Sequence, residues 1–99
     1  MLTYAILSLL KIKGLKYLEV VLPTVLRVGP YRFFFYAGDG NEPPHIHIER
    51  EDKIAKFWLM PVRLQKSGGF ESSELVKLQR ITEEHKQELL RTWNDYFNT

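Results

Sequence analysis

The stretch that most constrains this chain is residues 38–50, where a glycine-rich turn and a proline pair lead into alternating polar and apolar residues. Neighbouring side chains on a strand point to opposite faces of the sheet. A strand that begins at His45 therefore places His45, His47 and Glu49 on one face and the two intervening isoleucines on the other. The isoleucines have the pattern of a core face, so we expect the polar row to carry the function.

The composition indicates one small globular domain. The chain has 99 residues, of which 44% are hydrophobic and 26% charged, which is typical of neither a disordered nor a membrane-embedded protein. There is no cysteine, which excludes disulfides and thiolate metal sites. We therefore expect a cytoplasmic protein with no membrane partner.

Five stretches have the composition of β-strands. The run 31–36 is aromatic with apolar groups on both faces, which is typical of a central strand. Ser67, Gly68 and Gly69 close this β-rich part of the chain. We predict a small antiparallel sheet of about four strands, with the last stretch at most a short edge strand. The five stretches are residues 24–28, 31–36, 45–50, 54–60 and 62–65.

The last third of the chain has helical periodicity. Ser72 is a good N-cap, and apolar residues then recur at three- and four-residue spacing as far as Tyr96. This predicts one amphipathic helix over residues 72–97, or a helix pair with a break near residues 80–82. A small antiparallel sheet followed by such helices is an α+β domain.

Residues 1–22 differ from the rest and are predicted to be a leader outside the domain. They contain a short apolar run, then three lysines and one glutamate, which together account for the whole formal charge of +2. The apolar run is shorter than the roughly 20 residues of a membrane-spanning helix. Its positive charges follow the run, whereas in a secretory signal they precede it. The remaining chain is neutral, so its overall charge does not indicate nucleic-acid binding.

Several segments resemble a small bacterial domain of unknown function, the DUF4160 family. The most specific is the Glu-Pro-Pro-His-Ile-His core of residues 42–47. The resemblance covers residues 23–99, which we take as the domain, and it implies a component of a toxin–antitoxin-type or DNA-linked gene pair. The core lies within a matching segment of residues 41–49, and the other segments are residues 23–29, 31–36, 55–59, 69–70 and 93–97.

The family also bears on where translation starts. Its members typically begin with Met-Pro-Thr, where this chain has Leu22, Pro23 and Thr24. Leucine can be encoded by TTG, which bacteria also use as a start codon. We therefore expect Leu22 to mark the initiator, with residues 1–21 being upstream sequence.

The row of His45, His47 and Glu49 has three interpretations. Two imidazoles and a carboxylate are metal ligands that suit zinc or another divalent ion. Alternatively, two histidines act as general base and general acid on a phosphodiester. In the third, the row is a polar sheet face bonded to neighbouring loops. The remaining histidine, His85, lies on the apolar stripe of the helix and is interpreted as a core residue.

Three further residues are candidates for the same neighbourhood. Arg32 interrupts an apolar strand, while Lys56 and Trp58 share a face of the strand that follows the histidines. With the histidines they would form a pocket for phosphate and base. In the alternative, Trp58 is a core residue and the two cations pair with Glu49 or Glu42.

Two functions follow from these patterns. The first is a cytoplasmic bacterial binding module of a toxin–antitoxin-type two-gene system. It would contact a protein from a neighbouring gene, or a nucleic acid, through His45, His47, Glu49 and Trp58. The second is a small phosphodiesterase or nuclease, metal-assisted or not, that uses His45 and His47, with Arg32 or Lys56 holding phosphate. A third, structural alternative is a domain stabilised by a divalent metal.

Overall fold

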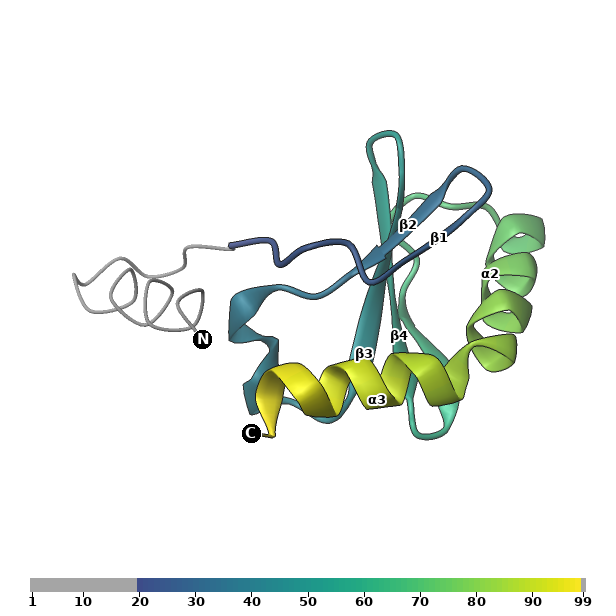
Figure 1. The fold of residues 1–99 in the computed structure, drawn as a ribbon. Helices are drawn as coiled ribbons and strands as arrows, with labels where there is room; N and C mark the ends of the chain where they lie inside the picture. The colour runs from purple at the N-terminus through teal and green to yellow at the C-terminus, as the bar shows by residue number, and fades with distance from the viewer. Residues whose placement is uncertain (1–19, 99) are drawn as a thin grey trace.

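The structure is a computed structural model that describes residues 20–98, so most of the predicted leader, residues 1–19, lies outside the described residues. Figure 1 shows a sheet with helices at the C-terminal end of the chain. The sheet is antiparallel and its strands lie in sequence order, as a meander. The strands are β1 (Leu26–Val28), β2 (Tyr31–Phe34), β3 (His45–Arg50), β4 (Lys53–Leu59) and β5 (Val62–Lys66); η1 (Ala37–Asn41) is a 3₁₀ helix, and α2 (Ser72–Glu84) and α3 (Lys86–Phe97) are α-helices.

The predicted α+β class is confirmed, with two differences of detail. The sheet has five strands because β5 pairs with β4 and completes the meander. The helical third is a pair, but α2 continues through residues 80–82 and ends at Glu84, and His85 separates it from α3. The Thr82 side chain is fully buried and its hydroxyl donates to the Leu78 carbonyl, so this residue belongs inside a helix that packs on the core.

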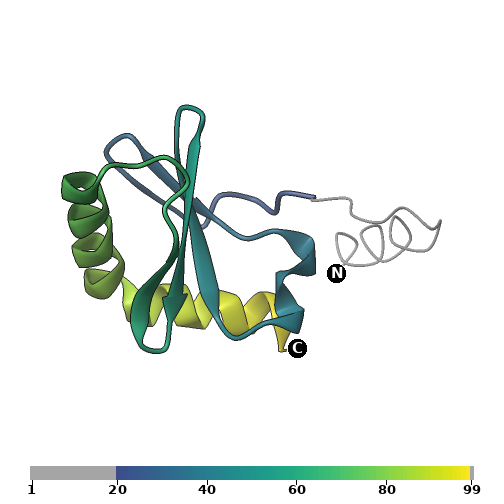
Figure 2. The same ribbon diagram turned by 180° about the vertical axis from the view of Figure 1, so that it is seen from behind.

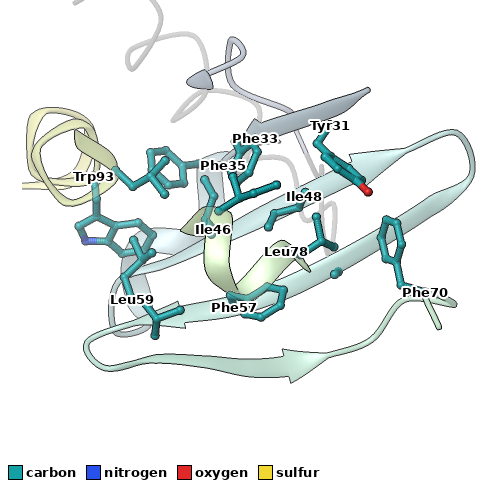
Figure 3. Packing of buried hydrophobic residues seen from close by; sticks show 14 of the residues in the cluster. Tyr31, Phe33, Phe35, Ile46, Ile48, Phe57, Leu59, Phe70, Leu78 and Trp93 are labelled. Atoms are coloured by element: carbon teal, nitrogen blue, oxygen red, sulfur yellow. The ribbon is translucent and has the colours of Figure 1, made fainter. Parts of the chain in front are cut away.

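The core lies between the sheet and the helices. Ile46 and Ile48 are fully buried and belong to the same apolar cluster as Leu78, Leu89 and Trp93 (Figure 3). Helix α3 crosses in front of the strands in Figure 1 and behind them in Figure 2, so it covers one face of the sheet. The isoleucines therefore face the helices, as the alternation predicted. The histidines alternate with them, although His45, at the start of β3, still contacts Trp93 of α3.

Residues 20–22 contact the domain. The Leu22 backbone N–H donates to the Phe35 carbonyl (2.9 Å), and the Ala37 N–H donates to the Val20 carbonyl (2.8 Å). The Leu22 side chain is only 2% exposed and belongs to the core. These residues extend the sheet edge beyond β2. Within residues 20–98, no helix is long and apolar enough to cross a membrane.

Candidate functional site on the histidine face

The strand register defines the face that carries the histidines. Directly paired residues of antiparallel strands share a face. His47 pairs with Lys56 of β4 and with Phe34 of β2, while His45 pairs with Trp58. We call this surface the histidine face; its residues are Arg27, Arg32, Phe34, His45, His47, Glu49, Ile54, Lys56, Trp58, Arg63 and Lys66.

Both candidate cations, Arg32 and Lys56, form ion pairs with carboxylates. The Arg32 guanidinium donates to Glu49 over 2.8 Å and lies 4.2 Å from the centroid of the Phe34 ring. The Lys56 ammonium is 2.5 Å from a Glu42 oxygen. From the sequence, these ion pairs are expected if the residues do not form a pocket for phosphate and base. Glu49 is therefore engaged by Arg32.

Trp58 does not belong to the apolar core cluster. It lies half-buried on the histidine face, where its ring centroid is 5.7 Å from that of His45. The Lys56 ammonium lies 4.8 Å from the Trp58 ring. Trp58 therefore packs beside the histidines, and its neighbours are a cation and an imidazole.

The helical turn η1 brings Asp39 onto the histidines. The Asp39 Oδ2 atom accepts the Tyr36 backbone N–H (2.8 Å) and lies 3.0 Å from His47 Nε2. Its Oδ1 atom lies 3.1 Å from His45 Nε2. Because a carboxylate can only accept, His47 Nε2 carries the proton of its hydrogen bond to Asp39. Asp39 therefore lies between the two imidazoles.

Close packing between η1 and the end of α3 holds this turn in place. A Cβ atom on Gly40 would lie 2.7 Å from Cδ1 of Phe97, so glycine lets the two segments approach. Figure 1 shows η1 beside the C-terminal end of α3. The Phe97 side chain in turn packs against the core. The position of Asp39 therefore depends on a contact between segments that are far apart in the sequence.

The charge on Asp39 is stabilised by its neighbours. Burial alone would raise the pKa of Asp39, but the nearby rings of His45 and His47 and the hydrogen bond from the Tyr36 N–H outweigh it and hold that pKa well below its usual range. The carboxylate is therefore ionised at neutral pH.

Both histidines are buried, but His45 has no exposed surface whereas His47 is 8% exposed. The His45 side chain is fully buried against the Trp93 ring, at a centroid distance of 5.0 Å, and its Nδ1 lies 3.0 Å from the Pro43 carbonyl oxygen. His47 lies beside a hollow of about 600 Å³. A molecule in the hollow would contact His47 directly, whereas His45 acts on it only through other groups.

The hollow combines predicted residues with residues that the sequence did not reveal. Of the candidates, His47 and Lys56 line it, and Arg32, Glu49 and Trp58 lie outside the lining. Asp39 and Lys66 were not predicted. Asp39 could have been found from the Gly-Asp-Gly turn just before the histidines, whereas Lys66 requires the register of β5. The lining consists of Tyr36, Gly38, Asp39, Asn41, Glu42, His47, Ile54, Lys56, Gln65 and Lys66.

Comparison with known proteins identifies the family. The model of the family described as Domain of unknown function (DUF4160) matches residues 31–94, which contain β2 to β5, α2 and most of α3. The chain belongs to this family, as the resemblance predicted. The searches of curated proteins and of solved structures found no match.

Proposed function

We propose that this protein is a cytoplasmic binding module of a toxin–antitoxin-type two-gene system, and that the hollow on its histidine face receives an acidic group of a partner protein. The partner would be encoded by the neighbouring gene. Most of the residues that line the hollow are polar, and they come from β3, β4, β5 and the segment of η1.

The observation that carries this proposal is a pair of lysines. Lys56 and Lys66 are opposite each other in the register of β4 and β5, and both line the hollow. Like charges directly opposite on neighbouring strands destabilise a sheet. Glu42 compensates Lys56, but Lys66 is exposed and takes part in none of the ion pairs found among the described residues. A carboxylate of a partner would compensate the second lysine.

The overall charge favours a protein partner over a nucleic acid. Residues 23–99 have as many acidic as basic side chains, because the formal charge of +2 comes from the first 22 residues. Nucleic-acid-binding domains usually present a positive patch that neutralises several phosphates. A neutral domain with one local lysine pair is better suited to a single acidic group.

Co-purification from the native host tests this proposal. We expect the full chain to retain the product of its neighbouring gene, and Lys66→Glu to lose it because a carboxylate then repels the acidic group. Arg91→Glu is the matched control, since Arg91 is an exposed cation of α3 outside the hollow. Equal retention by Lys66→Glu, or retention of RNA alone, would contradict a protein partner in the hollow.

A second function, hydrolysis of a phosphodiester, is supported by the bond between His47 and Asp39. A carboxylate that holds an imidazole by one nitrogen orients it as a general base. His47 meets this requirement at the edge of the hollow, with Lys56 in reach of a phosphate. His45 is fully buried, so it would not act as the matching acid in contact with the substrate.

Expression alone distinguishes the enzyme from the binding module. A phosphodiesterase acting on cellular RNA or DNA is expected to arrest growth, and His47→Gln should relieve the arrest by removing the base. His85→Gln is the control, because His85 lies at the junction of the two helices. If the wild-type chain leaves growth unchanged and does not cleave labelled single-stranded RNA or DNA, the hydrolytic function is excluded for those substrates.

A further inference from the structure

Three donor atoms converge where η1 meets β3. Asp39, His45 and His47 each offer one, and all three lie within 4.8 Å of one another. The Asp39 oxygens are 3.1 Å from His45 Nε2 and 3.0 Å from His47 Nε2. Two ligands of one tetrahedral ion, each about 2.1 Å from it, lie about 3.4 Å apart. The contacts have the length of hydrogen bonds, and small movements of the three side chains would turn them into a chelate.

The position of the proton on His45 distinguishes a metal chelate from a hydrogen bond between His45 and Asp39. A carbonyl oxygen only accepts, so the contact of 3.0 Å with the Pro43 carbonyl places a proton on His45 Nδ1. In a neutral imidazole, Nε2 is then a bare acceptor. This buried atom makes no hydrogen bond with the described residues, although an Asp39 oxygen is near. A lone pair and a carboxylate at that distance repel unless a positive charge lies between them.

The surroundings of the three donors resemble those of metal ligands. Ligating histidines commonly donate their second ring N–H to a backbone carbonyl, as His45 does to Pro43, and ligating carboxylates are themselves hydrogen-bonded, as Asp39 is by the Tyr36 N–H. Two imidazoles and a carboxylate suit first-row divalent ions, whereas Mg²⁺ and Ca²⁺ prefer oxygen ligands. We propose that Asp39, His45 and His47 bind one divalent first-row transition-metal ion.

This site replaces the ligand set expected from sequence, in which Glu49 was the third member. Glu49 is bonded to Arg32, and Asp39 takes its place from another segment. Asp39 and His47 line the hollow, so the ion would be accessible from it, with room for water or a ligand group. The lining has two carboxylates and two lysines, so its formal charges sum to zero. A bound dication would therefore make the hollow positive.

Metal binding is tested on the untagged full chain after treatment with a chelator. In isothermal titration calorimetry at neutral pH, we expect one equivalent of Zn²⁺ to bind, with the ring proton of His47 moving from Nε2 to Nδ1 so that Nε2 becomes a ligand. Mg²⁺ should not bind. The free chain should also melt at a higher temperature when Zn²⁺ is added, because the ion binds only the folded site.

Matched variants assign the ligands. Asp39→Asn and His47→Gln should each weaken Zn²⁺ binding by about tenfold or more. Asp52→Asn, in an exposed turn, and His85→Gln should bind as the wild type does. Two variants in different segments are used so that a folding defect in one does not decide the result, and circular dichroism checks both.

Two outcomes would overturn this proposal. The first is Zn²⁺ binding by both ligand variants with wild-type affinity. The second is a wild-type chain that binds no Zn²⁺, and nitrogen NMR would then be expected to show both ring nitrogens of His45 protonated. That would identify a buried imidazolium paired with Asp39. These measurements need no partner, so they can fail while the proposed binding function holds, and the reverse is also true.

Discussion

At the scale of single residues, the local backbone places Asp39 beside the histidines and requires glycine at position 68. Asp39 belongs to the helical turn η1 and accepts the N–H of Tyr36, the residue before that turn. It reaches the histidines because Gly40 lets η1 lie against Phe97. Gly68 lies where the chain leaves β5. Its φ angle is +61°, a left-handed conformation that other residues adopt at a cost.

Replacement of Gly68 by alanine is expected to be strongly destabilising. The added Cβ would lie 1.8 Å from the Ile54 carbonyl oxygen, a backbone atom that cannot move aside without disturbing β4. Together with the positive φ angle, this should lower the free energy of unfolding by about 3 kcal/mol or more, measured by urea denaturation. Gly38→Ala is the control, because nothing lies within 4 Å of its Cβ. Equal unfolding midpoints would show that the turn relaxes.

At the scale of elements, the alternation in β3 could be predicted because it is local. Ile46 and Ile48 needed only the two-residue period of a strand to be assigned to the core. The site was predicted less completely, since Asp39 depends on the packing of η1 against α3, and Lys66 depends on the bulge in the register of β4 and β5. Such contacts join distant segments and leave no local pattern.

Helix α2 gives a direct test of this division between buried and exposed faces. Leu78 is fully buried in the core, whereas Val76 on the same helix is 72% exposed. Leu78→Ala should cost about 3 kcal/mol through lost burial and the cavity that remains. Val76→Ala should change stability by less than about 0.5 kcal/mol. A thermal melt of each variant measures this, and comparable losses would mean that α2 does not pack as described.

An ion pair and a hydrogen bond join the start of α2 to the sheet, so we expect the stability of the protein to depend on pH. The Glu74 carboxylate accepts the Tyr31 hydroxyl (2.6 Å) and pairs with Arg50 (2.8 Å). These two bonds lower the pKa of Glu74. A carboxyl whose pKa is lower in the folded than in the unfolded state contributes stability above its unfolded pKa, about 4.3. That contribution is lost as the pH falls through the folded pKa.

We therefore expect Glu74→Gln to reduce the loss of stability on acidification below about pH 4.5. Urea midpoints measured between neutral and acidic pH for the variant and the wild type give the comparison. Glu83→Gln serves as the control, because Glu83 is exposed on the same helix. If both variants follow the wild-type pH profile, the ion pair with Arg50 does not persist in solution.

At the scale of the whole molecule, the question is where the folded unit begins. The change in composition predicted a boundary after residue 22, and the family model matches from residue 31. The structure shows that residues 20–22 are bonded to the segment after β2 and that Leu22 is buried with the core. Composition did not reveal this, because a buried leucine in a short extended segment has no periodicity around it.

Two shortened chains would locate that boundary. A chain of residues 20–99 keeps both backbone hydrogen bonds and the buried Leu22 side chain, and a chain of residues 23–99 loses them. Burial of a leucine is worth about 2–3 kcal/mol, so the shorter chain should unfold at a clearly lower urea concentration. Leu22→Ala in the longer chain should reproduce most of this loss, while Leu22→Met should restore it, because methionine fills a similar volume. Equal stability of both chains would instead place the start of the folded unit at residue 23.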